Sequence, residues 1–471
     1  MRRLTRRELL VGGTAAAAIG AAGVYELVDH FAEPAPTRRF GGGRAPEQHL
    51  LDGMRIIDDE GVEIVVPTLH HQIVTAEVTA DRDELPDARR ALEEILQRLD
   101  DDYEGTPAGL AVTVAWGLPY FRRYVPAAAE QHLPVDRRAS TGARRRHAVL
   151  DAIRFPSDPP DTILEANDVV FLLRSDRFEH IQAGTTEVTE GLAGVLEPTS
   201  IRKGFAGGGF EGGKGLPKAL AEVAEVPGAD LIPHGSELFL GFTSTQRHAL
   251  GPPRIVNFET LGLVELGPRS YFRGGTHMHL SHVFEDLEAW YLNFDFADRV
   301  DTTFRPRLNV QPGTKTVPQP PEESATAADV RSDFRRFGSI GHSSSMQSTS
   351  RLQADVMGSD GTLYRKGTAI PQRADFNTLD NPFFWSAQPE RDGMGREPAA
   401  GLHFVVFNPT SDDFHRTRLA MDGVLPGGAP IPLEPRARGQ GFNSILRTTH
   451  RQNFLVPPRR NRSFPLAELS S

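Results

Sequence analysis

Several stretches of the chain show the patterns of apolar and polar residues that predict β-strands. Residues 62–80 alternate and are rich in β-branched side chains, which is typical of one or two strands. Residues 109–121 predict a further strand that ends in a turn. Residues 168–176 contain a continuous apolar run, which is typical of a strand buried on both faces.

Two helices are predicted between and after these strands. In residues 81–103, four apolar side chains from Leu92 to Leu99 recur at helical spacing, with charged residues on the other face. Residues 177–196 predict the second helix. The order in the first half of the chain is therefore strand, helix, strand, strand, helix.

A similar order recurs in the second half. Strands are predicted within 260–292, where a helix also begins, and at 363–370 and 401–409. Residues 410–424 predict a helix that Thr410 or Ser411 would cap. Two halves of similar layout predict an α+β fold made of two ferredoxin-like units, of the dimeric α/β barrel type, with antiparallel sheets and peripheral helices.

Composition narrows the classes of function. The chain has 471 residues, a net charge of −10 and no cysteine. The negative charge argues against a general nucleic-acid role, because phosphate binding needs a basic surface. Without cysteine there are no disulfides, zinc–thiolate sites, iron–sulfur clusters or covalently attached c-type haem. Any haem would therefore be held non-covalently.

The N-terminus resembles a twin-arginine export signal. Its residues Thr5-Arg6-Arg7-Glu8-Leu9-Leu10 precede a weakly apolar run, Val11 to Val28, that is rich in alanine and glycine. We expect export by the twin-arginine machinery to the periplasm, the extracellular space or the cell envelope. A poorly hydrophobic N-terminal helix is the alternative interpretation.

These patterns predict five regions along the chain. We expect a signal peptide at 1–35, a linker at 36–60, an N-terminal half at 61–215, a C-terminal half at 216–425 and an irregular tail at 426–471.

Segments spread over about residues 65 to 425 resemble the dye-decolorising peroxidases, in the order found in that family. They read GLAVTVAWGLPYF, ANDVVFLLRSD, GGTHMHLSHVFEDLEAW, TLYRKGTAIP and AAGLHFVVFNPTSDDF. The resemblance implies a fold of two ferredoxin-like halves with a non-covalent haem b pocket in the C-terminal half. It also implies hydrogen peroxide and an organic electron donor as reactants, and it leaves a homo-oligomer open.

The resemblance assigns roles to two residues of the second half. His342 matches the proximal haem ligand, and a neutral imidazole nitrogen is a good ligand for ferric iron. Arg365 matches the distal arginine, whose charge would stabilise the negative charge that develops as peroxide is split. A polar loop histidine and a surface arginine are the alternative interpretations.

A glycine-rich stretch, FAGGGFEGGKGLPKAL, covers residues 205–220 and matches the family's distal loop, Gly-x-x-Asp-Gly. Gly209 and Phe210 fall in this loop, but Gly212 stands where the family has its proton-transferring aspartate. Glu211, one residue earlier, could replace that acid if the loop is rotated or bulged. A phosphate loop is excluded, because no Gly-Lys-Ser/Thr follows.

The strand within residues 274–282 departs from the family as well. It carries His282 near the position of an arginine that meets haem propionates, and the resemblance places Phe404 beside the haem. His277 and His279 share one face of this strand, so that with Glu285 they could bind a divalent metal. Polar residues that line a pocket or an interface are the simpler interpretation of this pair.

The sequence therefore predicts an exported haem b-binding protein with peroxidase activity, weakened by the loss of the distal aspartate. A non-enzymatic haem or iron carrier of the cell envelope is the alternative. A haem-free scaffold that keeps only the fold is the third possibility.

Overall fold

The structure is a computed structural model that describes residues 22–32, 44–242, 253–267, 269–317, 319–380, 397–434 and 436–469. The expected signal sequence up to residue 21, and much of the expected linker, lie outside these residues. Among the described residues, no helix is long and apolar enough to cross a membrane.

Residues 70–205 form a βαββαβ unit. Its strands are β3 (His70–Val78), β4 (Ala111–Gly117), β7 (Val169–Ser175) and β8 (Leu196–Phe205), and its main helices are α4 (Leu85–Asp102) and α7 (Phe178–Gly191). The strands pair antiparallel in the order β8-β3-β7-β4, which is the order of a ferredoxin-like sheet.

The second half builds a matching sheet. Its strands are β10 (Thr276–Glu285), β14 (Phe376–Thr378), β15 (Gly401–Asn408) and β16 (Leu446–Val456), and α14 (Ser411–Met421) connects the last two. They pair in the order β14-β15-β10-β16, with β13 (Gln372–Arg373) also on β15. The helix at 410–424 is confirmed, and Thr410 caps it by accepting a hydrogen bond from the Asp413 amide.

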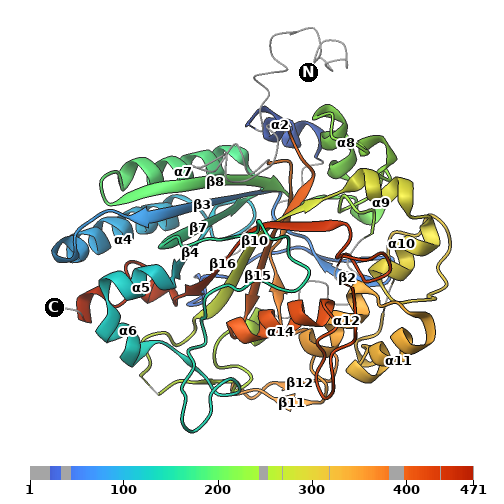
Figure 1. Cartoon of the computed structure of the whole chain (residues 1–471). Helices are drawn as coiled ribbons and strands as arrows, with labels where there is room; N and C mark the ends of the chain where they lie inside the picture. Colours follow the sequence, from blue (N-terminus) through green and yellow to red (C-terminus); the bar gives the residue numbers. More distant parts are fainter. Residues whose placement is uncertain are drawn as a thin grey trace.

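The two sheets join at both edges, so that the strands form a closed ring (Figure 1). Asn377 of β14 pairs with Phe205 of β8 at one seam. At the other seam, Phe454 and Leu455 of β16 pair with the end of β4. A closed ring leaves no free edge between the halves, and it divides every strand into an inner and an outer face.

The inside of the ring is a core to which both halves contribute. Ile73 and Leu172 from the first half pack in one cluster with Leu280 and Phe407 from the second. The neighbouring residues on the same strands point outwards: Val74 and Leu173 pack with Leu96 and its neighbours on α4. The helical spacing predicted for α4 is therefore confirmed, because its apolar stripe covers the outer face of the sheet.

The remaining elements are short. The N-terminal region contributes α2 (Ala22–Glu26), α3 (Val28–Phe31), β1 (Ile56–Asp59) and β2 (Val62–Val65). The connection from β4 to β7 within the first half contains α5 (Leu118–Tyr124), α6 (Pro126–His132), β5 (Val135–Asp136) and β6 (Ile163–Leu164). Between the halves lie α8 (Leu216–Val223) and β9 (Val264–Glu265). The second half adds α9 (Leu287–Asn293), α10 (Phe296–Thr303), α11 (Ala327–Phe337), α12 (His342–Ser350), β11 (Val356–Met357) and β12 (Leu363–Tyr364).

Two regions differ from the sequence prediction. The tail at 426–471 is not irregular, because it contains β16, which pairs with both β10 and β4. This strand has a polar sequence, and its buried polar groups find distant partners: Arg451 makes a bidentate pair with Asp158, at 2.7 and 2.9 Å. The strand predicted at 363–370 shrinks to β12, because the chain turns at Gly367, where φ is 85°.

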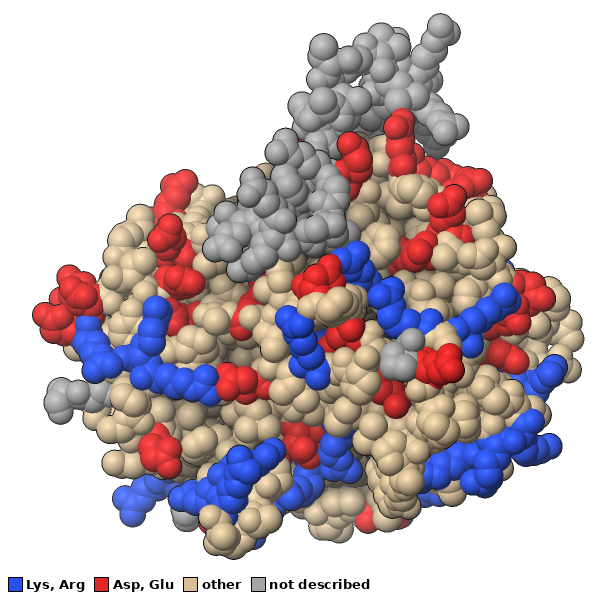
Figure 2. All heavy atoms as spheres, in the orientation of Figure 1, with Lys and Arg blue, Asp and Glu red and all other residues tan. Residues whose placement is uncertain are grey.

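Charge is spread over the surface. On the face shown in Figure 2, acidic and basic side chains lie interspersed.

The C-terminal segment is attached to the first half by a buried arginine. Arg462 is 1% exposed and donates to Asp100 at 2.7 Å and to Glu93 at 3.0 Å.

We expect Arg462→Met to lower the free energy of unfolding by roughly 2–4 kcal/mol, because carboxylates would lose a buried partner. Urea denaturation measures this. Arg98→Met is the control, because Arg98 pairs with Glu187 on the surface and its loss should cost less than about 1 kcal/mol. Equal losses of unfolding free energy in Arg462→Met and Arg98→Met would contradict the stabilising role of the buried Arg462.

Candidate functional site

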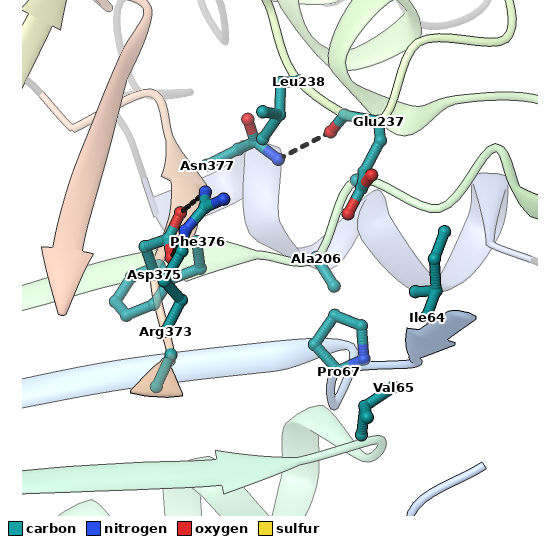
Figure 3. Close-up of a pocket in the computed structure, with 12 residues that line it drawn as sticks. Ile64, Val65, Pro67, Ala206, Glu237, Leu238, Arg373, Asp375, Phe376 and Asn377 are labelled. Carbon is teal, nitrogen blue, oxygen red and sulfur yellow. Dashed lines mark hydrogen bonds and ion pairs between the residues drawn. The ribbon is translucent and has the colours of Figure 1, made fainter. Parts of the chain in front are cut away.

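A small cavity lies where the two halves meet. It has a volume of about 50 Å³. The cavity is lined by residues of both halves (Figure 3), namely Ile64, Val65, Pro67, Ala206, Gly207, Glu237, Leu238 and residues 373–377. That volume has room for a few water-sized molecules, and it is well below the ~300 Å³ or more of pockets for larger ligands.

Arg373 and Asp375 form one wall of the cavity. The guanidinium donates to both carboxylate oxygens, from Nε at 2.9 Å and from Nη2 at 2.6 Å. Arg373 belongs to β13 and lies opposite Val406 of β15, so it points to the outer face of the second sheet. The pair therefore presents a fixed cation and a fixed carboxylate side by side.

Glu237 faces this pair from the other side of the cavity. Its backbone carbonyl accepts a hydrogen bond from the Asn377 amide at 3.0 Å, while its carboxyl group points into the cavity (Figure 3). Among the described residues that carboxyl group has no hydrogen-bond partner. Burial raises the pKa of Glu237 to about 7, although Arg373 opposes the shift. The group can therefore gain or lose a proton near neutral pH.

The glycine-rich loop holds Glu237 in this position. A Cβ on Gly207 would lie 1.6 Å from the Glu237 carbonyl oxygen, and one on Gly215 would lie 1.8 Å from that of Ser236. The two segments thus run backbone against backbone, and only glycine allows that approach. Gly207 and Gly215 therefore serve this contact.

The loop residues that the sequence singled out point elsewhere. Glu211 is exposed, and its carboxylate pairs with Arg55 at 3.3 Å. Phe210 packs against the cluster of Val62 and Ile64, and a Cβ on Gly212 would meet open space. Glu211 does have left-handed backbone with φ of 54°, but the rotation turns its carboxylate toward Arg55 and away from the cavity.

Arg365 also lies outside the cavity. Its side chain is 72% exposed and pairs with Asp355 at 2.6 Å. The segment that pairs with β15 comes later in the chain and carries Arg373.

His342 is the first residue of α12 and lies largely buried. Its ring is 4.4 Å from that of Phe442, and Nδ1 has no hydrogen-bond partner among the described residues. Burial, and then the charges of Arg373 and Arg418, lower the pKa of His342 to about 3. The imidazole is therefore neutral at physiological pH, and Arg373 is close enough to act on it.

The outer face of the second sheet lies on the side of α14 and α12, which pack against each other. The register places Val283 opposite Leu402 and Ser281 opposite Phe404 on this face. Val283, Leu402 and Phe404 remain only half-buried. His282 points the other way, into the ring, where its Nδ1 lies 2.6 Å from the Thr449 hydroxyl. His282 therefore lies on the opposite side of the sheet from Phe404.

His277 and His279 share this outer face, as the sequence predicted, and His279 is already engaged by neighbouring side chains. His279 has Asn453 Oδ1 at 2.7 Å from Nδ1 and stacks on Phe414 at 3.4 Å. Burial lowers the pKa of His277 to about 3 and that of His279 well below its usual value. Among the residues that the structure describes, no group of three or more potential ligands could hold a metal ion.

A family model described as "Family of unknown function (DUF7405)" matches residues 68–458. No curated protein matches the sequence.

Among solved structures, a DyP-type peroxidase from Cellulomonas bogoriensis is 16% identical, with 88% of this chain and 96% of that chain covered and a TM-score of 0.51. A DypB variant from Rhodococcus jostii RHA1, in complex with haem, is 13% identical, with 84% and 96% covered and a TM-score of 0.47. A dye-decolorizing protein from V. cholerae is also 13% identical, with the same coverage and a TM-score of 0.45. The similarity to the Cellulomonas protein shows that this α+β chain has the fold of the DyP-type peroxidases.

A buried carboxyl group near the site generates a prediction. Glu285 ends β10 on the outer face, and burial, followed by the charge of Asp375, raises its pKa to about 8. Its Oε2 has no hydrogen-bond partner among the described residues. Unfolded chains release this proton near pH 4.5, so the contribution of Glu285 to stability is present below that pH and is lost as the pH rises toward 8.

We therefore expect Glu285→Gln to match the wild type in stability at pH 5 and to exceed it at pH 8.5 by about 3 kcal/mol. Urea denaturation at both pH values measures the difference. The exposed Glu288→Gln on the following helix is the matched control and should show no such trend. A gap between Glu285→Gln and wild type that stays the same at both pH values would contradict the assignment.

Proposed function

The chain belongs to DUF7405, a family of unknown function, and we propose that it is a haem b-binding protein with peroxidase-like activity. The observation that carries the proposal is His342, a largely buried, neutral imidazole on the side of the sheet where Arg373 points. Its Nδ1 has no hydrogen-bond partner among the described residues. The shared fold with the DyP-type peroxidase from Cellulomonas bogoriensis supports it.

The residues on this side fit a haem. His342 would ligate the iron, because its low pKa keeps a nitrogen lone pair available at neutral pH. The half-buried side chains of Val283, Leu402 and Phe404 would contact the apolar face of the macrocycle. Binding would be non-covalent, because the chain has no cysteine. The cofactor would supply the redox chemistry that reduces hydrogen peroxide and oxidises an organic donor.

Two protein groups would support this reaction from the cavity. Its volume of about 50 Å³ suits a molecule of the size of hydrogen peroxide. Arg373 would place a positive charge where negative charge develops. Glu237 would accept a proton at its carboxylate and return it, because its pKa lies near 7. Glu237 would thus take the role that the sequence resemblance offered to Glu211, with Gly212 in place of the family's aspartate.

The second candidate is a non-enzymatic haem carrier of the cell envelope. One observation favours it: Asp375 accepts hydrogen bonds from Nε and Nη2 of Arg373 in a bidentate pair, which neutralises the cation that a peroxidase would need. In either role the N-terminal motif supports export by the twin-arginine machinery, to the periplasm, the extracellular space or the envelope.

Haem ligation is tested by spectroscopy. We expect wild-type protein reconstituted with haem b to show a Soret band, and His342→Gly to lose most of its haem affinity. Added imidazole should restore the band of His342→Gly, because it fills the ligand position. His180→Gly is the control, because His180 lies on α7, in the first half of the chain. Unchanged haem binding by His342→Gly would remove His342 as the ligand.

Peroxide turnover with a dye distinguishes enzyme from carrier. If Glu237 transfers the proton, Glu237→Gln should lower the rate by about 100-fold, and Glu211→Gln should leave it unchanged. A haem-loaded wild type without turnover would favour the carrier. A loss of turnover in Glu211→Gln alone would return the role to the glycine-rich loop.

A further inference from the structure

The last part of the predicted signal peptide is packed into the folded protein. Val24, Tyr25 and Val28 of α2 and α3 are at most 2% exposed. They share a hydrophobic cluster with Leu220 of α8 and Phe205 of β8. In Figure 1, α2 lies beside α8, close to the end of β8. A signal peptide that is cleaved off would not be expected to pack into the core of the folded protein.

The Tyr25 hydroxyl makes a set of buried hydrogen bonds to the end of β14. It donates to Asp380 Oδ1 at 2.9 Å and accepts from the Leu379 amide at 3.0 Å. The Thr378 hydroxyl lies 3.1 Å away. Tyrosine is well suited to this place, because its ring fills the apolar cluster while its hydroxyl satisfies polar groups.

Asp380 depends on this contact. It is 3% exposed, and burial raises its pKa to about 7, whereas the bonds from the Lys203 amide and from Tyr25 oppose the shift. His403 Nε2 lies 3.7 Å from the same carboxylate. Removal of Tyr25 would leave a buried carboxyl group without one of its donors, which is costly in a protein interior.

A second bond ties the same segment to the first half. Asp29 Oδ1 lies 2.6 Å from Nε2 of His70, the first residue of β3. The segment 22–31 therefore spans the seam at which Asn377 of β14 pairs with Phe205 of β8. Asn377 also lines the candidate cavity, so the segment 22–31 supports the strand that forms a wall of this cavity.

We propose that residues 22–31 form a permanent clamp across this seam, and that the mature exported protein keeps them. Any removal of the signal then takes place before residue 22 and not near residue 35. The clamp rests on the contacts of Tyr25 and Asp29, and it holds whether or not the protein binds haem.

The test has two arms on the full chain. In the first, the chain is produced in a host with twin-arginine export, and the intact mass of the exported protein gives its first residue. We expect a start at or before Ala22. A start after Phe31 in a protein that remains folded would overturn the proposal.

The second arm does not depend on export. Tyr25→Phe removes only the hydroxyl, and we expect it to lower the midpoint of thermal unfolding by about 1–3 °C. The control is Tyr103→Phe, because the Tyr103 ring contacts His180 while its hydroxyl makes no hydrogen bond among the described residues. Equal midpoints for Tyr25→Phe and this control would overturn the clamp, even where the chain is not exported.

Discussion

The pairing of β10 with β16 is the constraint on which the rest of the structure depends. Because β16 also pairs with β4, and β14 pairs with β8, the two sheets close into one ring. Closure assigns a side to every residue on the strands. Leu280 and His282 face a filled interior, whereas His279, Ser281 and Val283 face the helices.

The candidate site follows from this division. Arg373 reaches the outer side because it lies opposite Val406, and His342 approaches from the start of α12. Glu237 is held in position by the close contact of two irregular backbone segments. Gly207 makes this contact possible, because it has no side chain. The site thus combines one residue fixed by strand register, one by a helix start and one by glycine packing.

The sequence was informative where side-chain periodicity decides the structure. The stripe from Leu92 to Leu99, the strand at 401–409 and the cap at Thr410 all have local signals that agree with tertiary packing. It failed where partners are distant. Arg451 is a residue typical of a surface loop, and the sequence of β16 does not show that the distant Asp158 pairs with it. Glu237 carries no local signal, because its role depends on a glycine loop that lies about thirty residues earlier in the sequence.

The position of β16 has a consequence for biosynthesis. This strand ends at Val456, near the C-terminus, yet it separates β10 from β4 in the ring. A nascent chain cannot complete the barrel while these last residues are still inside the ribosome. The first half must therefore wait with an unpaired edge on β4, which is a hazard for aggregation. The barrel therefore closes only after β16 has left the ribosome, and a chaperone that shields the β4 edge would act before that point.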